Sequence, residues 1–409
     1  MGEFLILKSG DEAREILTSF AALATESVAL DHAFDRVLGE DLLALEDTPP
    51  WPRSVMDGYA VRARDVQGAS ESVPCYLKLV GTVPMGAVLE RRIGPGEAAG
   101  ISTGGVLPEG ADAVVMIEYV DRARAEEIEV HRSVAAGDNL IRPGEDLRRG
   151  DMVVPRGKRL RPQDVGALAA FGRTEVRVFR RPRVAVLSTG NEVVPPDKAP
   201  APGQVRDVNQ YALSAQVRRA GGEPLLGGIV ADDAAALRAR VVELLDESDM
   251  VMLSGGSSVG VRDVASEVLA SLGGSVLFHG INVRPGKPTL CARVGDKPVL
   301  GMPGFPVSSM VIFDVFVRPL LWRLSGESAR DPWPARRRAR FSRRHASAAG
   351  REDWVRVRLE SRADGAWAAP VLGGSAALST VVRADGLVRI DAGSEGIGEG
   401  EEIEVFLYE

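Results

Sequence analysis

The chain has 409 residues, a formal net charge of −7 and a hydrophobic fraction of 45%, and at roughly 100–200 residues per domain this length predicts two to four folded domains. Its two cysteines allow at most one disulfide bond and lack the paired spacing of a zinc or haem site. The acidic excess and the aromatic content of 5% disfavour nucleic-acid binding. We expect a cytoplasmic protein that binds a small molecule.

Export and membrane insertion are also disfavoured. The first residues offer only four apolar side chains in a row, fewer than the core of a signal peptide needs. The longest apolar stretch, 310–322, is interrupted by Asp314 and Arg318 and is too short to cross about 30 Å of hydrocarbon. The sequence therefore predicts no membrane segment.

The chain is predicted to begin with an amphipathic helix. Ser9-Gly-Asp-Glu12 forms a capping box, and apolar residues recur at helical spacing over 13–21. A second helical stretch is expected over 30–43. Three prolines within 47–52 then exclude helix and mark a domain boundary.

Short β-branched runs separated by glycine and proline turns predict a β-rich module over 47–146. A short helix is expected at 161–171. Residues 1–46 and 147–180 are assigned to a small linking domain with helical content, whose first helix can also pack on the α/β domain described next. The clearest strands of the β-rich module are expected at 76–80, 113–117 and 127–131.

From residue 181 strands alternate with helices, which predicts a three-layer, mostly parallel α/β sheet domain over 181–326. Residues 327–409 alternate in short runs and are expected to form a C-terminal β-barrel or sandwich. The fold class is therefore α/β and multidomain. Strands of the α/β domain are expected at 184–187, 225–230, 250–253 and near Val276 and Pro298. Its helices are expected at 209–220, 233–245, 261–272 and 306–324.

Three loops of the α/β domain carry residues suited to a charged ligand, and such sheets bind ligands beyond the carboxyl ends of their strands. The first loop holds Ser188, Thr189, Gly190 and Glu192. The second holds Ser254, Gly255, Gly256, Ser258, Gly260 and Asp263. The third holds Arg284 and Lys287 and leads, after one more strand, to Pro303 and Pro306.

The residue types in these loops indicate an anion site beside a cation site. Paired glycines let consecutive backbone amides approach an anion without interference from a Cβ atom. Lys287 lies between Pro285 and Pro288, so its backbone is stiff and its ammonium group is expected to act as a fixed positive charge. Only six of the chain's 50 basic residues are lysine, which makes this lysine notable. The Glu192 carboxylate can hold a cation. Each loop, taken alone, also fits an ordinary structural turn.

Several common motifs are excluded by inspection. Gly280 and Gly286 are separated by five residues and Pro288 follows Lys287, so there is no P-loop. Ser257 breaks the dinucleotide fingerprint. One alternative stays open, because Gly256-Ser-Ser-Val-Gly260 has the letters of a hydrolase nucleophile elbow with Ser258 at its centre.

The β-rich module adds further polar turns. Asp57 lies in Ser54-Val-Met-Asp-Gly-Tyr-Ala60, and Thr103 lies in Ile101-Ser-Thr-Gly-Gly105. Each is most often a structural turn when taken alone. Together with the loops of the α/β domain they suggest a site built from two domains.

With these motifs, the chain resembles the bacterial molybdopterin molybdenumtransferase family, which is also similar to the C-terminal part of gephyrin and of plant molybdenum-insertase proteins. The resemblance covers nearly the whole chain, and its motifs occur in the family's order. They are Ser54-x-Met-Asp-Gly-Tyr-Ala, Thr103-Gly, Gly144-Glu-Asp, Ser188-Thr-Gly-x-Glu192, Ser254-Gly-Gly-x-Ser-x-Gly260 and Pro285-Gly-Lys-Pro288.

The resemblance implies an elongated homodimer that takes adenylylated molybdopterin and molybdate, inserts the metal into the pterin dithiolene and releases AMP with Mg²⁺ or another divalent ion present. The substrate is expected in the α/β domain, with the β-rich module of the other subunit closing the cleft. Contact with the adenylyltransferase of the same pathway is also expected. The functional positions implied are Asp57, Thr103, Glu192, Asp232, Asp263, Lys287 and Ser375.

The chemistry of these residues suits that reaction. Molybdate and the adenylyl phosphate are anions, which favour amide nests, hydroxyls and a fixed cation such as Lys287 or Arg284. Magnesium favours hard oxygens and uses one or two carboxylates beside substrate phosphate and water. Glu192 and Asp263 are the candidate ligands.

Two alternative functions stay open, and one residue differs from the family's usual pattern. The α/β domain alone also resembles the enzyme that adenylylates molybdopterin with ATP, and a non-catalytic scaffold that binds the pterin is the reading from another class. The departure is Phe305, which stands where the family usually has asparagine and removes an amide that could bond the ligand or cap a turn.

Overall fold

The computed structural model describes residues 7–255, 259–327, 331 and 333–408, with the side chains of 259–263 left outside the description. It divides the chain into two compact units. The large unit comprises Met1–Glu40, Arg156–Val165 and Thr174–Glu409, and the small unit comprises Asp41–Pro155 and Gly166–Arg173. No helix in the described ranges is long and apolar enough to span a membrane.

A six-stranded sheet forms the centre of the large unit. Five of its strands, β16, β13, β17, β21 and β18, run in one direction, and β20 alone runs antiparallel between β21 and β18, so the predicted mostly parallel sheet is confirmed. Strand β13 is buried along almost its whole length because helices cover both faces. The strand order is β16 (Glu223–Val230), β13 (Arg183–Thr189), β17 (Met250–Gly255), β21 (Lys297–Met302), β20 (Leu290–Val294) and β18 (Ser275–His279).

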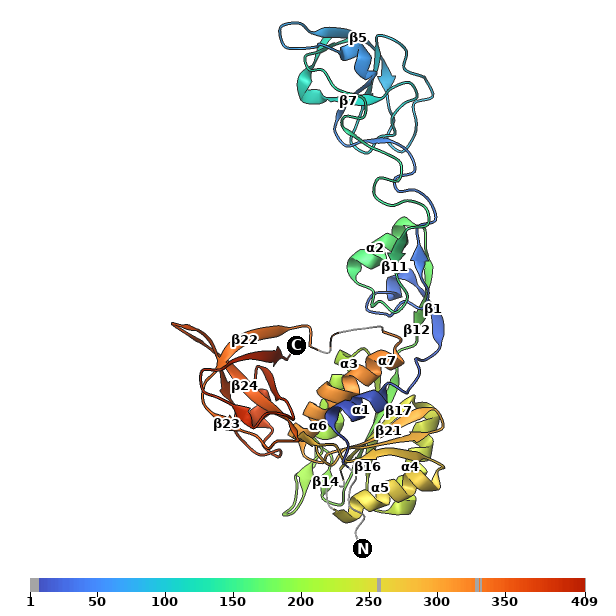
Figure 1. Ribbon diagram of the computed structural model, residues 1–409. Helices are drawn as coiled ribbons and strands as arrows, with labels where there is room; N and C mark the ends of the chain where they lie inside the picture. Colours follow the sequence, from blue (N-terminus) through green and yellow to red (C-terminus); the bar gives the residue numbers. More distant parts are fainter. Residues whose placement is uncertain (1–6, 256–258, 328–330, 332, 409) are drawn as a thin grey trace. The chain divides into compact units, whose positions relative to one another are not determined.

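Helices lie on both faces of this sheet, which gives the expected three layers (Figure 1). Successive residues of β13 point to opposite faces: Val184 and Val186 pack in one core, and Ala185 and Leu187 pack in the other. The first core receives α1 (Gly10–Leu17), α3 (Asn209–Arg219), α6 (Pro306–Ile312) and α7 (Arg318–Leu324). The second receives α4 (Ala234–Glu247) and α5 (Val259–Ser271).

The helix predicted over 306–324 is interrupted by a π-helical turn at Phe313–Val317. This turn buries Asp314, whose carboxylate accepts a 2.8 Å hydrogen bond from Arg219 of α3. Burial raises the pKa of Asp314. A continuous apolar pattern could not reveal the turn, because α-helical and π-helical residues bury the same kind of side chain.

The second predicted helical stretch, 30–43, is wrong. The structure has a single 3-10 turn at Leu30–His32, and Asp35 has a φ of +61°, which stops a helix. The backbone bonds instead to distant segments, as in Leu38 N–H to Lys158 O at 3.0 Å. Just before the turn, β1 (Thr25–Ala29) pairs antiparallel with β12 (Glu175–Phe179). Tertiary pairing has thus overridden local propensity.

The C-terminal region of the large unit is a closed β-barrel, as the alternating pattern predicts. It closes because β24 pairs with both β25 and β26. A short strand from the α/β region, β19 (Val283–Arg284), adds parallel to β24 and places Arg284 opposite Asp353. The barrel strands are β22 (Arg336–Phe341), β24 (Glu352–Arg362), β25 (Gly365–Pro370), β26 (Gly386–Ile390) and β28 (Glu402–Leu407). The shorter elements nearby are β14 (Val193–Val194), β15 (Val205–Arg206), β23 (His345–Ala346), β27 (Gly396–Ile397) and α8 (Ser379–Val382).

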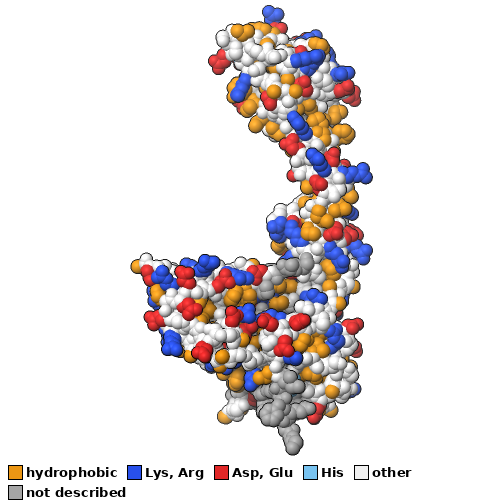
Figure 2. All heavy atoms as spheres, in the orientation of Figure 1, with side chains coloured by type: hydrophobic (Ala, Val, Ile, Leu, Met, Phe, Trp, Pro, Cys, Tyr) orange, Lys and Arg blue, Asp and Glu red, His pale blue; other side chains and the backbone are white. Residues whose placement is uncertain are grey.

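The small unit is built on a second six-stranded sheet, as expected for the β-rich module. Its helix α2 (Pro162–Ala170) contributes residues to both units. Figure 2 shows basic and acidic side chains intermingled on the visible face of the protein. The sheet order is β7 (Ala113–Met116), β4 (Gly58–Val61), β6 (Glu97–Ile101), β5 (Cys75–Thr82), β9 (Glu127–Val130) and β8 (Val120–Arg124). The shorter elements are β2 (Leu42–Leu43), β3 (Arg53–Ser54), β10 (Leu140–Ile141), β11 (Met152–Val154) and 3-10 turns at Ala63–Val66 and Ile117–Tyr119.

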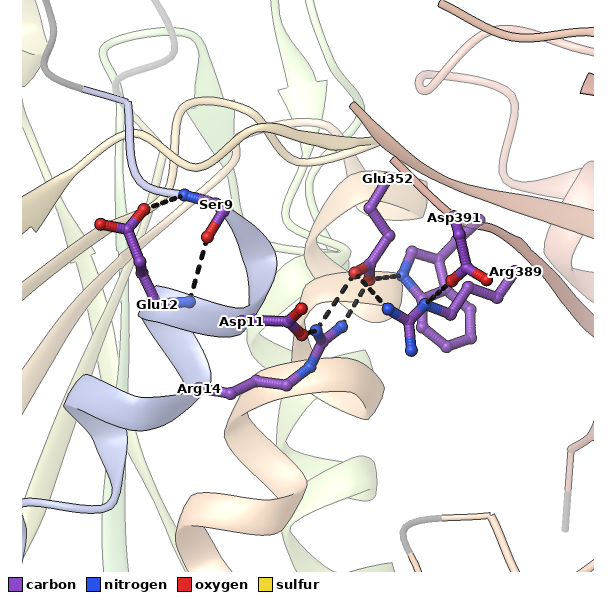
Figure 3. Close-up of polar contacts among 8 residues, drawn as sticks. Ser9, Asp11, Glu12, Arg14, Glu352, Arg389 and Asp391 are labelled. Carbon is purple, nitrogen blue, oxygen red and sulfur yellow. Dashed lines mark hydrogen bonds and ion pairs between the residues drawn. The ribbon is translucent and has the colours of Figure 1, made fainter. Parts of the chain in front are cut away.

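A buried carboxylate ties the first helix to the barrel (Figure 3). Glu352 accepts hydrogen bonds from Arg14 of α1, with Nη1 at 3.1 Å, and from the indole N–H of Trp354 at 2.6 Å. Arg389 of β26 pairs with the same carboxylate at 3.2 Å. One acidic side chain thus satisfies donors from three elements.

Replacing Glu352 by glutamine is expected to lower the free energy of unfolding by about 2 kcal/mol, because an amide turns donors toward two arginines that are only partly solvated. Equilibrium denaturation measures the change. Asp391→Asn is the matched control, since Asp391 pairs with Arg389 at 2.9 Å but its side chain is 74% exposed, and it should cost less than about 0.5 kcal/mol. Equal losses in the two variants would contradict the role given to Glu352.

Candidate functional site

The strand register brings the predicted loops to one edge of the large sheet. Thr189, the last residue of β13, pairs with Val230 of β16 and with Gly255 of β17. Ser254 pairs in turn with Met302 of β21. The loops that follow these four parallel strands therefore begin side by side.

The loop with Arg284 and Lys287 lies at the same edge. It joins the end of β18 to the start of β20, and Leu290 of β20 pairs with Gly301 near the carboxyl end of β21. Gly280 N–H bonds to Thr289 O at 2.8 Å, and Ile281 N–H bonds to Lys287 O at 3.0 Å, so the loop is closed on itself. The Lys287 side chain is exposed.

Two glycines allow the chain to pass closely at these strand ends. Gly255 has a φ of +138°, and a Cβ atom there would lie 2.0 Å from Thr189 O. Gly190 has a φ of +144°, and a Cβ atom there would lie 2.6 Å from Glu192 Oε2. Only glycine fits either position. The second contact shows that the Glu192 carboxylate folds back over its own loop.

Buried polar atoms at this edge lack partners within the described part of the chain. They are Ser188 Oγ, Asn209 Oδ1 and Asp232 Oδ1. Because buried polar groups in folded proteins are nearly always bonded, unsatisfied atoms gathered at strand ends indicate a place for a ligand. Asp232 is held there by Asn191, whose side-chain oxygen accepts from Asp232 N–H at 3.2 Å.

Asn209 is a residue that the motifs did not single out. Its Nδ2 donates to Ser254 Oγ at 2.7 Å and to Gly304 O at 2.8 Å, so it links the ends of β17 and β21. The side chain is 8% exposed. The sequence does place this asparagine at the first position of a predicted helix. Asparagine is common at helix starts, so the position alone did not indicate a role in the site.

A second part of the site is a pocket of about 350 Å³ between the β19 loop and the barrel, here called the positive pocket. Arg284, Ser375 and Arg356 of β24 are among its lining residues, together with His345 and Asp353. Val307 N–H of α6 bonds to Ser375 O at 3.2 Å, which ties the Ser375 loop to the start of α6.

The positive pocket carries an excess of positive charge. Asp353 is shared between a two-pronged contact from Arg351, at 2.6 and 3.0 Å, and a longer ion pair with Arg284 at 4.0 Å. Arg356 donates to Gly373 O at 2.8 Å, while its Nε is buried without a partner among the described residues. Burial lowers the pKa of Arg356, and the charge of Arg284 lowers that pKa further. The arrangement favours an anion.

His345 adds a neutral imidazole to the same pocket. Burial lowers the pKa of His345, against an opposing effect of Asp353. Neither His345 nor Arg356 was predicted, because each lies in a barrel segment without a motif. Only the pairing of β19 with β24 reveals that these barrel residues face Arg284.

The last loop of the sheet contains Pro303, Phe305 and Pro306. Pro303 is buried, and its carbonyl accepts a hydrogen bond from Ser309 of α6. Pro306 occupies the first turn of α6, where its missing N–H costs nothing. Phe305 is the N-cap residue, with a 51% exposed ring and no side-chain cap.

Phe305→Asn is expected to raise the free energy of unfolding by about 1 kcal/mol, because the asparagine oxygen can accept a hydrogen bond from a free N–H of the first turn. Phe305→Ala serves as control, since it removes the ring without adding a cap. Thermal and chemical denaturation measure both. A stability of Phe305→Asn no greater than that of Phe305→Ala would show that the position needs no cap.

In the small unit the structure brings Asp57 and Thr103 together. Asp57 Oδ1 accepts from Thr103 N–H at 2.8 Å and from its Oγ1 at 3.2 Å. Both residues are exposed, and Thr103 lines a pocket of about 440 Å³ that also contains Trp51 and Arg53. The two predicted residues thus form one hydrogen-bonded pair.

Part of the second predicted loop lies outside the described residues. Gly256 and Ser258 belong to it, and so does the hydrolase alternative that depends on Ser258. The side chain of Asp263 also lies outside the description, as does any contact of Gly260 beyond its place in α5. Their predicted roles stay predictions.

Three family models match successive parts of the chain. They are "MoeA N-terminal region (domain I and II)" over residues 8–172, "Probable molybdopterin binding domain" over 185–323 and "MoeA C-terminal region (domain IV)" over 338–408. Together these matches follow the order of the motifs identified in the sequence.

Individual proteins agree with the family models. The molybdopterin molybdenumtransferase of a Nostoc species is 38% identical over 305 residues, covering 74% of this chain and 70% of its own length. That of Staphylococcus aureus is 29% identical over 397 residues, covering 97% and 94%. A crystal structure of a molybdopterin biosynthesis MoeA protein from Pyrococcus horikoshii superposes with a TM-score of 0.85 at 38% identity, covering 98% of this chain and 99% of that one. The resemblance read from the loops is confirmed, and the chain belongs to the molybdopterin molybdenumtransferase (MoeA) family.

Proposed function

We propose that this protein is a molybdopterin molybdenumtransferase, an enzyme of molybdenum cofactor biosynthesis that inserts molybdate into the dithiolene of adenylylated molybdopterin and releases AMP. Family membership supports the reaction class. The observation that carries the assignment to this chain is the positive pocket, which joins the strand-end loops through the contact of Ser375 with α6.

The positive pocket suits molybdate. Arg284 and Arg356 can each donate to its oxygens, and charge-assisted hydrogen bonds of this kind are the strong ones. The Ser375 loop adds hydroxyl and backbone donors at the rim. His345, whose pKa is lowered by burial, contributes a donor or acceptor without adding a third positive charge.

The strand ends suit the adenylyl phosphate. Ser188 and Thr189 offer hydroxyls, and Lys287 supplies a cation from the neighbouring loop. Gly190 and Gly255 are proposed as backbone contacts of the same phosphate. Asp57 and Thr103 of the small unit are proposed as further substrate contacts. The remaining predicted substrate contacts are Ser254, Gly256, Ser258, Gly260, Pro303 and Pro306.

A divalent ion, Mg²⁺ by preference, fits the acidic side chains of this edge. Glu192 reaches over Gly190, and Asp232 has an unsatisfied buried oxygen. No group of three His, Cys, Asp or Glu side chains gathers within the described residues. Mg²⁺ usually takes one or two carboxylates beside water and substrate oxygens. Glu192 and Asp263 are the proposed ligands, and the bound ion would supply Lewis-acid polarisation of the pyrophosphate linkage.

The proposal includes a cytoplasmic homodimer, contact with the adenylyltransferase that supplies the substrate, and four domains. Their proposed boundaries are 1–46 with 147–180, 47–146, 181–326 and 327–409.

The test is molybdate-dependent release of AMP from adenylylated molybdopterin by the purified protein. Release that requires both molybdate and a divalent ion supports the proposal. Pyrophosphate release from ATP and molybdopterin would assign the preceding adenylylation step instead. Tight pterin binding without turnover would indicate a scaffold.

A further inference from the structure

A pocket of about 420 Å³ in the large unit has no role in the function proposed above. It lies where α1, the π-helical turn and α7 meet the barrel, and it is here called the aryl pocket. Its volume falls in the range of pockets that hold small molecules. Its apolar lining is largely aromatic and includes Leu17, Phe316, Leu320, Trp333, Trp354 and Phe406.

The aromatic rings of the aryl pocket are held in place by one another. Trp333 and Trp354 stack with their ring centroids 5.8 Å apart, and the ring of Phe406 lies 5.5 Å from each of them. The indole N–H of Trp354 is fixed further, because it donates to Glu352 at 2.6 Å. A ligand therefore meets a preformed surface and loses little free energy in ordering it.

Most of the positive charge around the aryl pocket is neutralised. Four arginines and two aspartates are among its lining residues. Arg14 and Arg389 both pair with the buried carboxylate of Glu352 (Figure 3). Arg336 pairs with two other carboxylates. These three guanidinium groups thus have partners within the protein.

Arg323 is the exception among the four arginines. Its Nε donates to Phe20 O at 2.7 Å, just beyond the end of α1, which fixes the direction of the side chain. Within the described part of the chain its two Nη atoms have no hydrogen-bond partner and no carboxylate forms an ion pair with it. The side chain is exposed. The two Nη atoms of a guanidinium group can bind both oxygens of one carboxylate, so Arg323 offers such a site to a ligand.

The aryl pocket is separate from the positive pocket. Arg284, Arg356 and Ser375 line the positive pocket and not the aryl pocket. Trp354 lines both, so the two pockets share one wall, formed by β24. A ligand in the aryl pocket would therefore bind beside the proposed anion site without occupying it.

We propose that the aryl pocket binds a small molecule made of an aromatic ring system that bears one carboxylate. The rings lie against the apolar lining, and the carboxylate pairs with Arg323. One uncommitted arginine suits a single negative charge, whereas a dianion would also face the carboxylates of Asp11 and Asp331. An ammonium group in the same place would be repelled by Arg323.

The experiment is isothermal titration of the purified full-length protein with 1-naphthaleneacetate. Two compounds with the same rings serve as controls, 1-naphthaleneethanol, which is neutral, and 2-(1-naphthyl)ethylammonium, which is positive. The alcohol should bind about tenfold more weakly than the carboxylate, because it lacks the charge-assisted hydrogen bonds to Arg323. The ammonium compound should bind more weakly still. The carboxylate should also raise the melting temperature, since it contacts α1, α7 and the barrel at once.

Variants of the lining test the position of the ligand. Arg323→Gln should raise the Kd of 1-naphthaleneacetate about tenfold and leave the Kd of the alcohol unchanged. Arg338→Gln is the matched control, because it removes the same charge from an exposed side chain of β22 outside the pocket, and it should bind like wild type. Thr18 is an exposed lining residue, so Thr18→Trp should obstruct the pocket and weaken binding of both compounds. Thermal melting without ligand checks that each variant is folded.

Several outcomes would overturn the inference. They are absence of 1-naphthaleneacetate binding to the wild-type protein, equal affinity for the carboxylate and the alcohol, and wild-type affinity in either Arg323→Gln or Thr18→Trp. An equal loss in Arg323→Gln and Arg338→Gln would assign the binding to general surface charge and overturn it too. All these measurements report binding alone, so their outcome does not depend on whether the protein releases AMP.

Discussion

Arg356→Gln is expected to raise the molybdate concentration that gives half-maximal AMP release by between about tenfold and 100-fold, since a hydrogen bond to a charged group contributes about 1.5–3 kcal/mol. Arg356 lies in the positive pocket with Arg284, and no carboxylate of the described residues forms an ion pair with it. Its charge is therefore available to a bound anion. The effect should appear mainly in the molybdate requirement, with the rate at saturating molybdate less affected.

The matched control is Arg358→Gln, which removes the same charge two residues along strand β24 from a side chain that is exposed and outside the pocket. Its molybdate requirement should equal that of the wild type. Isothermal titration with molybdate checks the binding component directly. Equal effects of the two substitutions would mean that general surface charge, and not the positive pocket, attracts the anion.

Glu192→Gln is expected to slow AMP release about 100-fold or more, because Glu192 is a proposed ligand of the divalent ion and its loss would remove several kcal/mol of charge stabilisation in the reaction. Glu192 is exposed, so the variant should unfold at the wild-type temperature. Part of the lost activity should return at high concentrations of the divalent ion. Steady-state assays across a magnesium titration measure both effects.

Glu223→Gln is the control, since Glu223 is an exposed carboxylate at the opposite end of the sheet, at the start of β16. It should leave both the rate and the magnesium requirement unchanged. Asp232→Asn should behave like a milder Glu192→Gln, because Asp232 lies beside the same loop with one unsatisfied oxygen. Full activity of Glu192→Gln at wild-type magnesium would remove Glu192 from the proposed site.

The regular elements of the α/β region were predictable because their signals are local. Apolar runs such as 184–187 and 250–253 are buried on both sides and read as strands, and the structure extends them only to Thr189 and Gly255. The helix expected at 209–220 is observed at Asn209–Arg219. The carboxyl ends of parallel strands lie at the same edge of a sheet, so the loops that follow these strands were expected to form one site.

Local signals failed where distant backbone decides the structure. The segment 30–43 contains helix-forming residues, yet several of its N–H groups bond to carbonyls more than a hundred residues away in sequence, those of Leu160, Lys158 and Arg177. Strand β20 was not predicted, because its burial depends on lying between β21 and β18. In both cases the partner determines the conformation.

The sequence by itself determined most strands and helices of the α/β region and the glycine-bearing loops at the strand ends, since these depend on residues close together in the chain. Only the tertiary structure decided that Arg356 of the barrel meets Arg284, that Asn209 links two strand ends, and that Leu17 and Trp354 border one pocket. The physical reason is that pockets form where segments far apart in sequence pack together, and no local pattern records which surfaces will meet.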